Sequence, residues 1–113
     1  MQGRVVWTGG TTMDGINGAE DRISMDWETG PSPMQLMLQM VGACSLVDVV
    51  IGLKERPFSD AWVDLDSTRA ETQPRRFTSI TMVYHVVGDV PQKLVERVVA
   101  KSCLLYTSDA ADD

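Results

Sequence analysis

The chain has 113 residues, with 10 basic and 16 acidic side chains that give a formal net charge of −6. This acidity argues against a nucleic acid or an anionic membrane surface as the main partner, because both attract basic proteins. A chain of this length has enough residues for one modest hydrophobic core, so we predict a single domain.

The last eleven residues, CLLYTSDAADD at positions 103–113, differ in character from the chain before them. Back-translated into codons, CLLYTS can be encoded by TGT-CTC-TTA-TAC-ACA-TCT. This DNA sequence resembles the end of an adapter used in transposase-based sequencing libraries. We interpret residues 103–113 as a non-native tail and residues 1–102 as one domain truncated at its C-terminus. A natural acidic tail is the alternative. Removing the three aspartates of the tail changes the formal charge from −6 to −3.

The first thirty residues predict an antiparallel strand meander. Residues 4–8 are rich in valine, and residues 22–27 alternate between apolar and polar side chains, so that one face of this strand is apolar. Glycines punctuate the segment and indicate turns: Gly9, Gly10, Gly15 and Gly18.

A long apolar helix is predicted over residues 33–56. Ser32 can cap the first amide groups, and Pro33 suits the first helical position. Pro57 disfavours helical geometry in the residue before it, so we expect the helix to end at Arg56, with Lys54 and Arg56 in its last turn.

Two further strands and a second helix follow. Residues 61–69 and 80–87 have strand character, and the polar residues 70–77 connect them as a hairpin. A helix begins near Pro91, and its apolar positions share one face: Leu94, Val95, Val98 and Val99. The order predicts an α+β domain in which antiparallel sheet packs on a long central hydrophobic helix.

The long helix is apolar around most of its circumference, and a small domain covers only one side of it. A membrane span is disfavoured, because Asp48 near the centre of a span would cost about 2.5 to 3.5 kcal/mol. A second copy of the chain is the simplest cover, so we predict an obligate homodimer with these helices near the interface and no membrane partner.

The segment GPSPMQLMLQMVGACSLVDVV, residues 30–50, is followed by Pro74, by Arg76 and Phe77, and by VVGDV before the last helix. Together they resemble the OsmC/Ohr family of osmotically induced and organic-hydroperoxide-resistance proteins. The resemblance implies an intertwined α+β homodimer whose active members reduce hydroperoxides with a helix-borne cysteine. It places Cys44 at the position of the attacking cysteine.

Three family features do not match. The second cysteine, which closes a disulfide in active members, follows the terminal helix in a motif resembling S..KYC, and this chain reaches only Ser102 before the tail. Family members carry an acidic residue at one of the two positions after the helix-opening proline. In this chain those positions are the uncharged Met34 and Gln35. The active-site arginine comes from the N-terminal glycine-rich loop of the family, where this chain has residues 11–13, Thr-Thr-Met.

Residue chemistry leaves two interpretations of Cys44 open. A thiolate there could attack a small organic hydroperoxide, and a thiol reductant would then complete a hydroperoxide reductase cycle. Alternatively, Cys44 is a small core residue in the stretch GACS, and the protein is a noncatalytic dimer that binds a small apolar ligand. Asp48 lies four residues on, on the same helix face, and its charge disfavours the thiolate.

No metal or cofactor is expected. His85 and Cys44 do not make a metal-ligand cluster with other histidines or cysteines, and we interpret His85 as structural. Residues 1–102 contain a single cysteine, and the N-terminus has no apolar segment typical of a signal peptide, so we expect a cytoplasmic protein.

Overall fold

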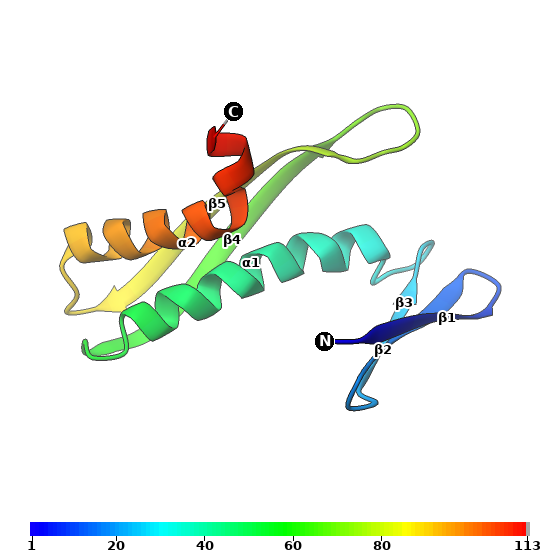
Figure 1. Ribbon diagram of the computed structural model, residues 1–113, viewed down its shortest axis with the longest axis horizontal. Helices are drawn as coiled ribbons and strands as arrows, with labels where there is room; N and C mark the ends of the chain where they lie inside the picture. Colours follow the sequence, from blue (N-terminus) through cyan, green and yellow to red (C-terminus); the bar gives the residue numbers. More distant parts are fainter. Residues whose placement is uncertain (113) are drawn as a thin grey trace. The chain divides into compact units, whose positions relative to one another are not determined.

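The computed structural model describes the backbone of residues 1–112 and the side chains of residues 1–102. The chain forms two compact units, residues 1–39 and 40–113 (Figure 1), which are described separately below. The expected α+β class is confirmed. The interpretation of residues 103–113 as a tail concerns side chains that lie outside the described residues, and it stays a prediction.

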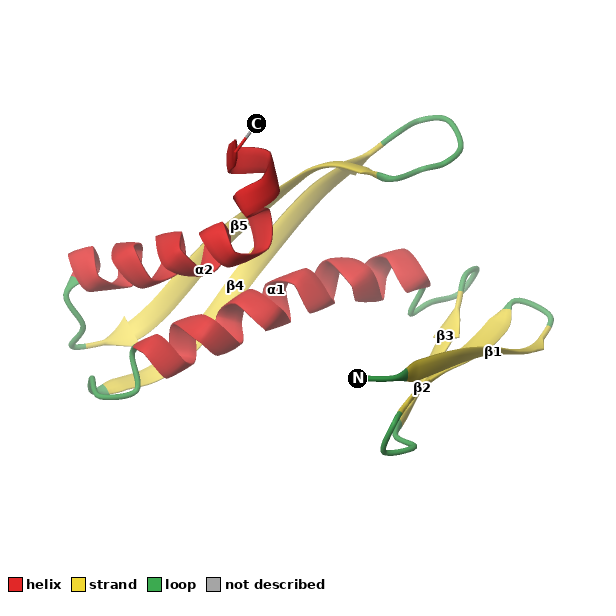
Figure 2. Ribbon diagram, in the orientation of Figure 1, coloured by secondary structure: helices red, strands yellow, loops and turns green. Residues whose placement is uncertain are grey.

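The first unit contains the predicted meander (Figure 2). Strands β1 (Gly3–Gly9), β2 (Thr12–Asn17) and β3 (Arg22–Asp26) pair antiparallel in that order. One face of this sheet is apolar, because Val5 and Ile23 both pair with Gly15 and so lie on the same side. Val5 and Ile23 are exposed, so the first unit does not cover its own apolar face.

The turn after β3 is organised by the Asp26 carboxylate. Its Oδ1 accepts hydrogen bonds from the Glu28 amide at 2.9 Å, the Thr29 amide at 3.2 Å and the Thr11 hydroxyl at 2.8 Å. Chiefly because of the Glu28 bond, followed by the Thr11 bond, the pKa of Asp26 is lowered from 3.8 to about 2. These bonds favour the ionised carboxylate in the folded state.

Asp26 therefore makes the stability of the folded state depend on pH, in a direction that its lowered pKa fixes. A lowered folded-state pKa contributes stability above the unfolded value of about 3.8, and that contribution is lost as the pH falls towards 2. We expect the stability advantage of the wild type over Asp26→Asn to shrink between pH 5 and pH 2.5 in urea unfolding curves. An advantage that is equal at the two pH values would contradict this assignment.

The second unit contains most of helix α1 (Pro33–Gly52), strands β4 (Phe58–Arg69) and β5 (Phe77–Gly88), and helix α2 (Gln92–Asp112). The strands form a two-stranded antiparallel hairpin, as expected. Figure 2 shows the two helices beside this hairpin.

Helix α1 ends at Gly52, so the predicted end at Arg56 was wrong. The chain leaves the helix through a tight turn in which the Arg56 amide donates to the Leu53 carbonyl at 2.9 Å, and Leu53 is fully buried. The burial of Leu53 and the short connection to β4 stop the helix before Pro57 does. Lys54 and Arg56 consequently lie outside the last turn of α1.

Two glycines let α1 approach its neighbours closely. A Cβ on Gly42 would lie 2.7 Å from Leu65 Cδ1 of β4, and a Cβ on Gly52 would lie 2.7 Å from Val98 Cγ1 of α2. Both distances are shorter than real carbon contacts, so a larger side chain at either position would separate the elements. Val49 and Leu53, fully buried, complete the core on this side of the helix.

The opposite side of α1 is not covered. Within the described residues, α1 is the helix long and apolar enough to cross a membrane, and only 17% of its 18-residue window is buried. Length and composition alone are weak evidence for a span, because core helices of soluble proteins have the same properties. The expected absence of a membrane partner therefore stays a prediction.

Candidate functional site

Cys44 lies on the uncovered side of α1. Its side chain is exposed, and the large apolar side chains that share its face are exposed as well. They recur with Cys44 at intervals of three and four residues, the spacing of a helix-packing seam. In order along the helix, this uncovered face consists of Met40, Cys44, Val47 and Ile51.

The stretch GACS divides between two sides of the helix. Gly42 and Ser45 are buried against the rest of the second unit, whereas Ala43 and Cys44 are exposed. The interpretation of Cys44 as a buried core residue is therefore wrong for the described chain. The close approach that the small residues allow is made by Gly42 to the β4 strand.

A shallow apolar groove runs along α1, and its lining includes Ala43, the sequence neighbour of Cys44, but not Cys44 itself. Its volume is about 360 Å³. An apolar molecule or a partner helix suits such a lining better than a polar ligand does. The groove is lined by Ala43, Leu46, Val47, Val50 and Ile51.

A buried hydroxyl cluster lies behind Cys44 and joins three elements. Ser45 of α1 hydrogen-bonds to the Tyr84 hydroxyl of β5, and its Oγ lies 2.9 Å from Ser102 Oγ of α2. The Ser102 hydroxyl also lies 3.2 Å from the Ser45 carbonyl oxygen. Both serines are 1% exposed. Because buried hydroxyls are costly when unsatisfied, these bonds fix how α1, α2 and β5 meet.

Asp48 connects this cluster to the Cys44 side of the helix. It is the one charged residue in the sequence of α1, and its side chain is half-buried. The Ser102 hydroxyl approaches Asp48 Oδ2 at 3.4 Å. Since Asp48 follows Cys44 by four residues, the two side chains are neighbours on the helix surface.

The helix-opening residues form a reciprocal cap. The backbone amide of Gln35 donates to Ser32 Oγ at 3.1 Å, and the backbone amide of Ser32 donates to the side-chain Oε1 of Gln35 at 2.9 Å. This is a capping box, with glutamine at the third helical position. Ser32 acts as the predicted cap. The Gln35 carbonyl oxygen is thereby engaged in holding the helix start.

His85 lies on the hairpin and belongs to a different cluster. Its ring stacks on Trp62 with centroids 4.8 Å apart, and Nε2 lies 3.1 Å from Asp64 Oδ2. These contacts hold the His85 ring on the hairpin, and the interpretation of His85 as structural stays a prediction. Among the described residues, no group of three or more His, Cys, Asp or Glu side chains could hold a metal ion.

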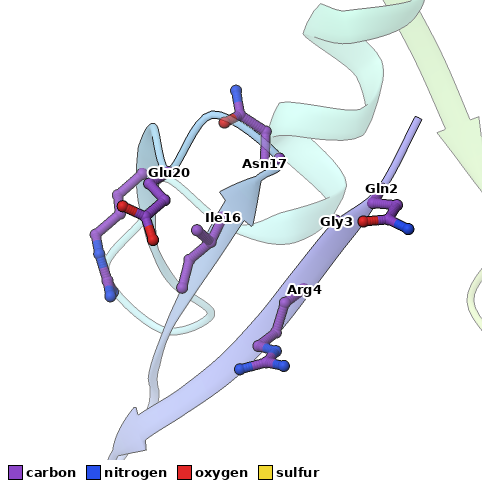
Figure 3. Close-up of a pocket in the computed structure, with 8 residues that line it drawn as sticks. Gln2, Gly3, Arg4, Ile16, Asn17 and Glu20 are labelled. Carbon is purple, nitrogen blue, oxygen red and sulfur yellow. The ribbon is translucent and has the colours of Figure 1, made fainter.

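The first unit has a polar pocket of about 600 Å³ at the end of its sheet, shown in Figure 3. Arg4 and Arg22 both contribute to its lining, since each pairs across the sheet with Ile16. Arg22 is held by Asp14, with Nη1 and Oδ2 3.1 Å apart. Glu20 brings a negative charge to the same pocket.

Comparisons with known proteins give one family and several relatives. The model of the OsmC-like protein family matches residues 26–108. Protein YhfA of Escherichia coli K12 is 39% identical over 116 residues, covering 97% of this chain and 87% of that protein. 

Solved structures match the fold of this chain. A hypothetical protein from Aquifex aeolicus VF5 is 29% identical with a TM-score of 0.80, over 89% of this chain and 76% of that one. An OsmC-like protein from Mycoplasma pneumoniae has a TM-score of 0.79 over 91% of this chain and 79% of that one. At 12% identity, the Mycoplasma protein is a match in fold alone.

Proposed function

Because the chain belongs to the OsmC-like protein family, we propose that it is a thiol-dependent hydroperoxide reductase of the cytoplasm, with Cys44 as the reacting group. The observation that carries the proposal is the exposure of Cys44 in the single chain, on a helix that also lines an apolar groove. An exposed thiol is accessible to a substrate, and an apolar lining suits the organic part of an alkyl hydroperoxide.

The proposed reaction transfers one oxygen atom to sulfur. The Cys44 thiolate attacks the terminal oxygen of the hydroperoxide, an S–O bond forms, and the O–O bond breaks. The hydroperoxide is reduced to an alcohol, and Cys44 is oxidised to a sulfenic acid. An added thiol reductant returns Cys44 from the sulfenic acid to the thiol.

A homodimer is part of the proposal. The uncovered face of α1 has the three-and-four spacing by which two helices pack together, and a second copy of the same face can cover it. Because this face includes Cys44, the partner must leave the thiol open to the hydroperoxide. In sedimentation velocity without detergent, we expect a dimer for the wild type and a shift to monomer for Val47→Asp. Asp66→Asn, on an exposed position of β4, is the control. A monomeric wild type would contradict the dimer.

One observation favours a noncatalytic apolar-ligand binder instead. The positions where the family resemblance implies an acidic residue are Met34 and Gln35, and the Gln35 carbonyl oxygen serves the helix cap. No carboxylate is available from either residue. The alternative protein would take an apolar molecule into the α1 groove and leave Cys44 unoxidised.

Consumption of an organic hydroperoxide distinguishes the two functions. Cumene hydroperoxide and dithiothreitol are mixed with the protein, and the remaining peroxide is measured over time. A reductase consumes many equivalents of peroxide per protein. With a binder, the peroxide disappears no faster than in the protein-free mixture. That result would reject the reductase proposal.

A further inference from the structure

We propose that Asp48 receives the proton of the Cys44 thiol and delivers it to the leaving oxygen of the hydroperoxide, and that Ser102 positions the Asp48 carboxylate for this transfer. The inference rests on the proposed reductase function and assigns the proton chemistry that this function requires.

The position of Asp48 calls for an explanation. It is the one charged residue of an apolar twenty-residue helix, and it is half-buried. Partly burying a carboxylate costs free energy unless it is paired or hydrogen-bonded. Its surroundings supply a hydroxyl, Ser102 at 3.4 Å, and place it four residues from the thiol.

The reaction needs a group that takes the proton from the thiol, because the thiolate is the form that attacks the peroxide. A carboxylate can take up that proton, and its charge is neutralised as the thiolate forms. General acid–base transfer of this kind contributes about 10² to 10⁴ in rate. The same carboxyl group then carries the proton that the departing oxygen needs.

The step balances without any further reactant. The carboxylate of Asp48 accepts the Cys44 proton, and the sulfur attacks the terminal oxygen of the alkyl hydroperoxide. An S–O bond forms and the O–O bond breaks, so that sulfur is oxidised to the sulfenic acid. The alkoxide that leaves takes the proton from Asp48, and the carboxylate is restored. The products are a sulfenic acid and an alcohol.

Ser102 is fixed well enough to position the carboxylate. It is 1% exposed, and Ser45 holds its hydroxyl at 2.9 Å. Ser45 is in turn bonded to Tyr84 of β5. The hydroxyl that faces Asp48 is therefore anchored by two other elements of the second unit.

Two reactions of Cys44 separate proton transfer from other roles of Asp48. Reaction with cumene hydroperoxide needs a proton for the leaving alkoxide, whereas alkylation by iodoacetamide releases iodide, which needs none. Both second-order rate constants are measured in a Cys103→Ser background, so that Cys44 is the one thiol present. Asp48→Asn keeps the shape and an acceptor for Ser102 but removes the proton acceptor.

For Asp48→Asn we expect the hydroperoxide rate constant to fall by about 10²-fold or more, and the alkylation rate constant to fall by much less, because alkylation shares the deprotonation of the thiol but has no leaving alkoxide to protonate. Ser102→Ala should lower the hydroperoxide rate by about 10-fold, as expected for loss of a supporting contact, and should again lower alkylation less. Asp66→Asn, the control at an exposed carboxylate of β4, should change neither.

The outcomes distinguish this inference from the function on which it rests. Equal losses in both reactions of Asp48→Asn would mean that Asp48 does not protonate the leaving alkoxide, and would overturn the inference. Unchanged hydroperoxide reactivity in Asp48→Asn, with a reactive wild type, would overturn it while leaving the reductase intact. A wild type that is alkylated but does not react with hydroperoxide would overturn both.

Discussion

Replacing Cys44 with serine will reduce the dithiothreitol-dependent consumption of cumene hydroperoxide to the rate of the protein-free mixture. A serine hydroxyl is not ionised at neutral pH and forms no sulfenic acid, so the oxygen-transfer step has no acceptor. We expect a fall of at least about 100-fold, the lower range for loss of a group that performs the chemistry. The measurement is the initial rate of peroxide loss at equal protein concentration.

The matched control is Cys103→Ser, which removes the other cysteine of the chain. It should retain the wild-type rate, because the proposal assigns the reaction to Cys44 and the reducing step to the added dithiol. Serine is close to cysteine in size, and Cys44 is exposed, so Cys44→Ser should keep its thermal unfolding temperature. Full activity in Cys44→Ser would show that the peroxide is consumed elsewhere.

Gly88→Ala will destabilise the protein by about 3 to 5 kcal/mol, a size of effect that point mutations reach when backbone strain and a steric clash coincide. Gly88 ends β5 with a φ of 153°, a conformation that L side chains rarely adopt. A Cβ there would lie 2.5 Å from the Pro57 carbonyl oxygen and closer still to Phe58 Cα. Neither atom can move without separating the ends of the hairpin.

Urea unfolding curves measure this change, with Gly18→Ala as the matched control. A Cβ on Gly18 meets its nearest neighbour, the Gln2 carbonyl oxygen, at 3.9 Å, which is an ordinary contact. We expect Gly18→Ala to shift the free energy of unfolding by less than about 1 kcal/mol. If both variants unfold at the same urea concentration as the wild type, that result would contradict the close contact described between Gly88 and Phe58.

Most elements of the fold could be predicted from local patterns. Alternation of apolar and polar residues located β3 and β4, and the Ser32-Pro33 pair located the start of α1, because these signals act between neighbours in the sequence. The end of α1 could not be found this way. Burial of Leu53 and the turn into β4 depend on contacts made by the folded chain, and they outweighed the local signal of Pro57.

The candidate site was only partly accessible to sequence reasoning. Cys44 and its neighbour Asp48 follow from helix periodicity and from the family resemblance. The hydroxyl cluster does not, because Tyr84 and Ser102 lie 39 and 57 residues from Ser45. Single serines and tyrosines carry no spacing signal that would bring them together. The exposure of Cys44 likewise required the packing of Gly42 and Ser45 on the opposite side of the helix.

The most direct test of the account is the intact mass of the Cys103→Ser protein after exposure to one equivalent of cumene hydroperoxide. A gain of one oxygen atom, about 16 Da, that dimedone captures as a sulfenic acid adduct on Cys44 is the predicted result. The same treatment of a protein that also carries Cys44→Ser should add nothing. An unmodified Cys44 in the presence of the peroxide would contradict the central claim that this thiol is the reacting group.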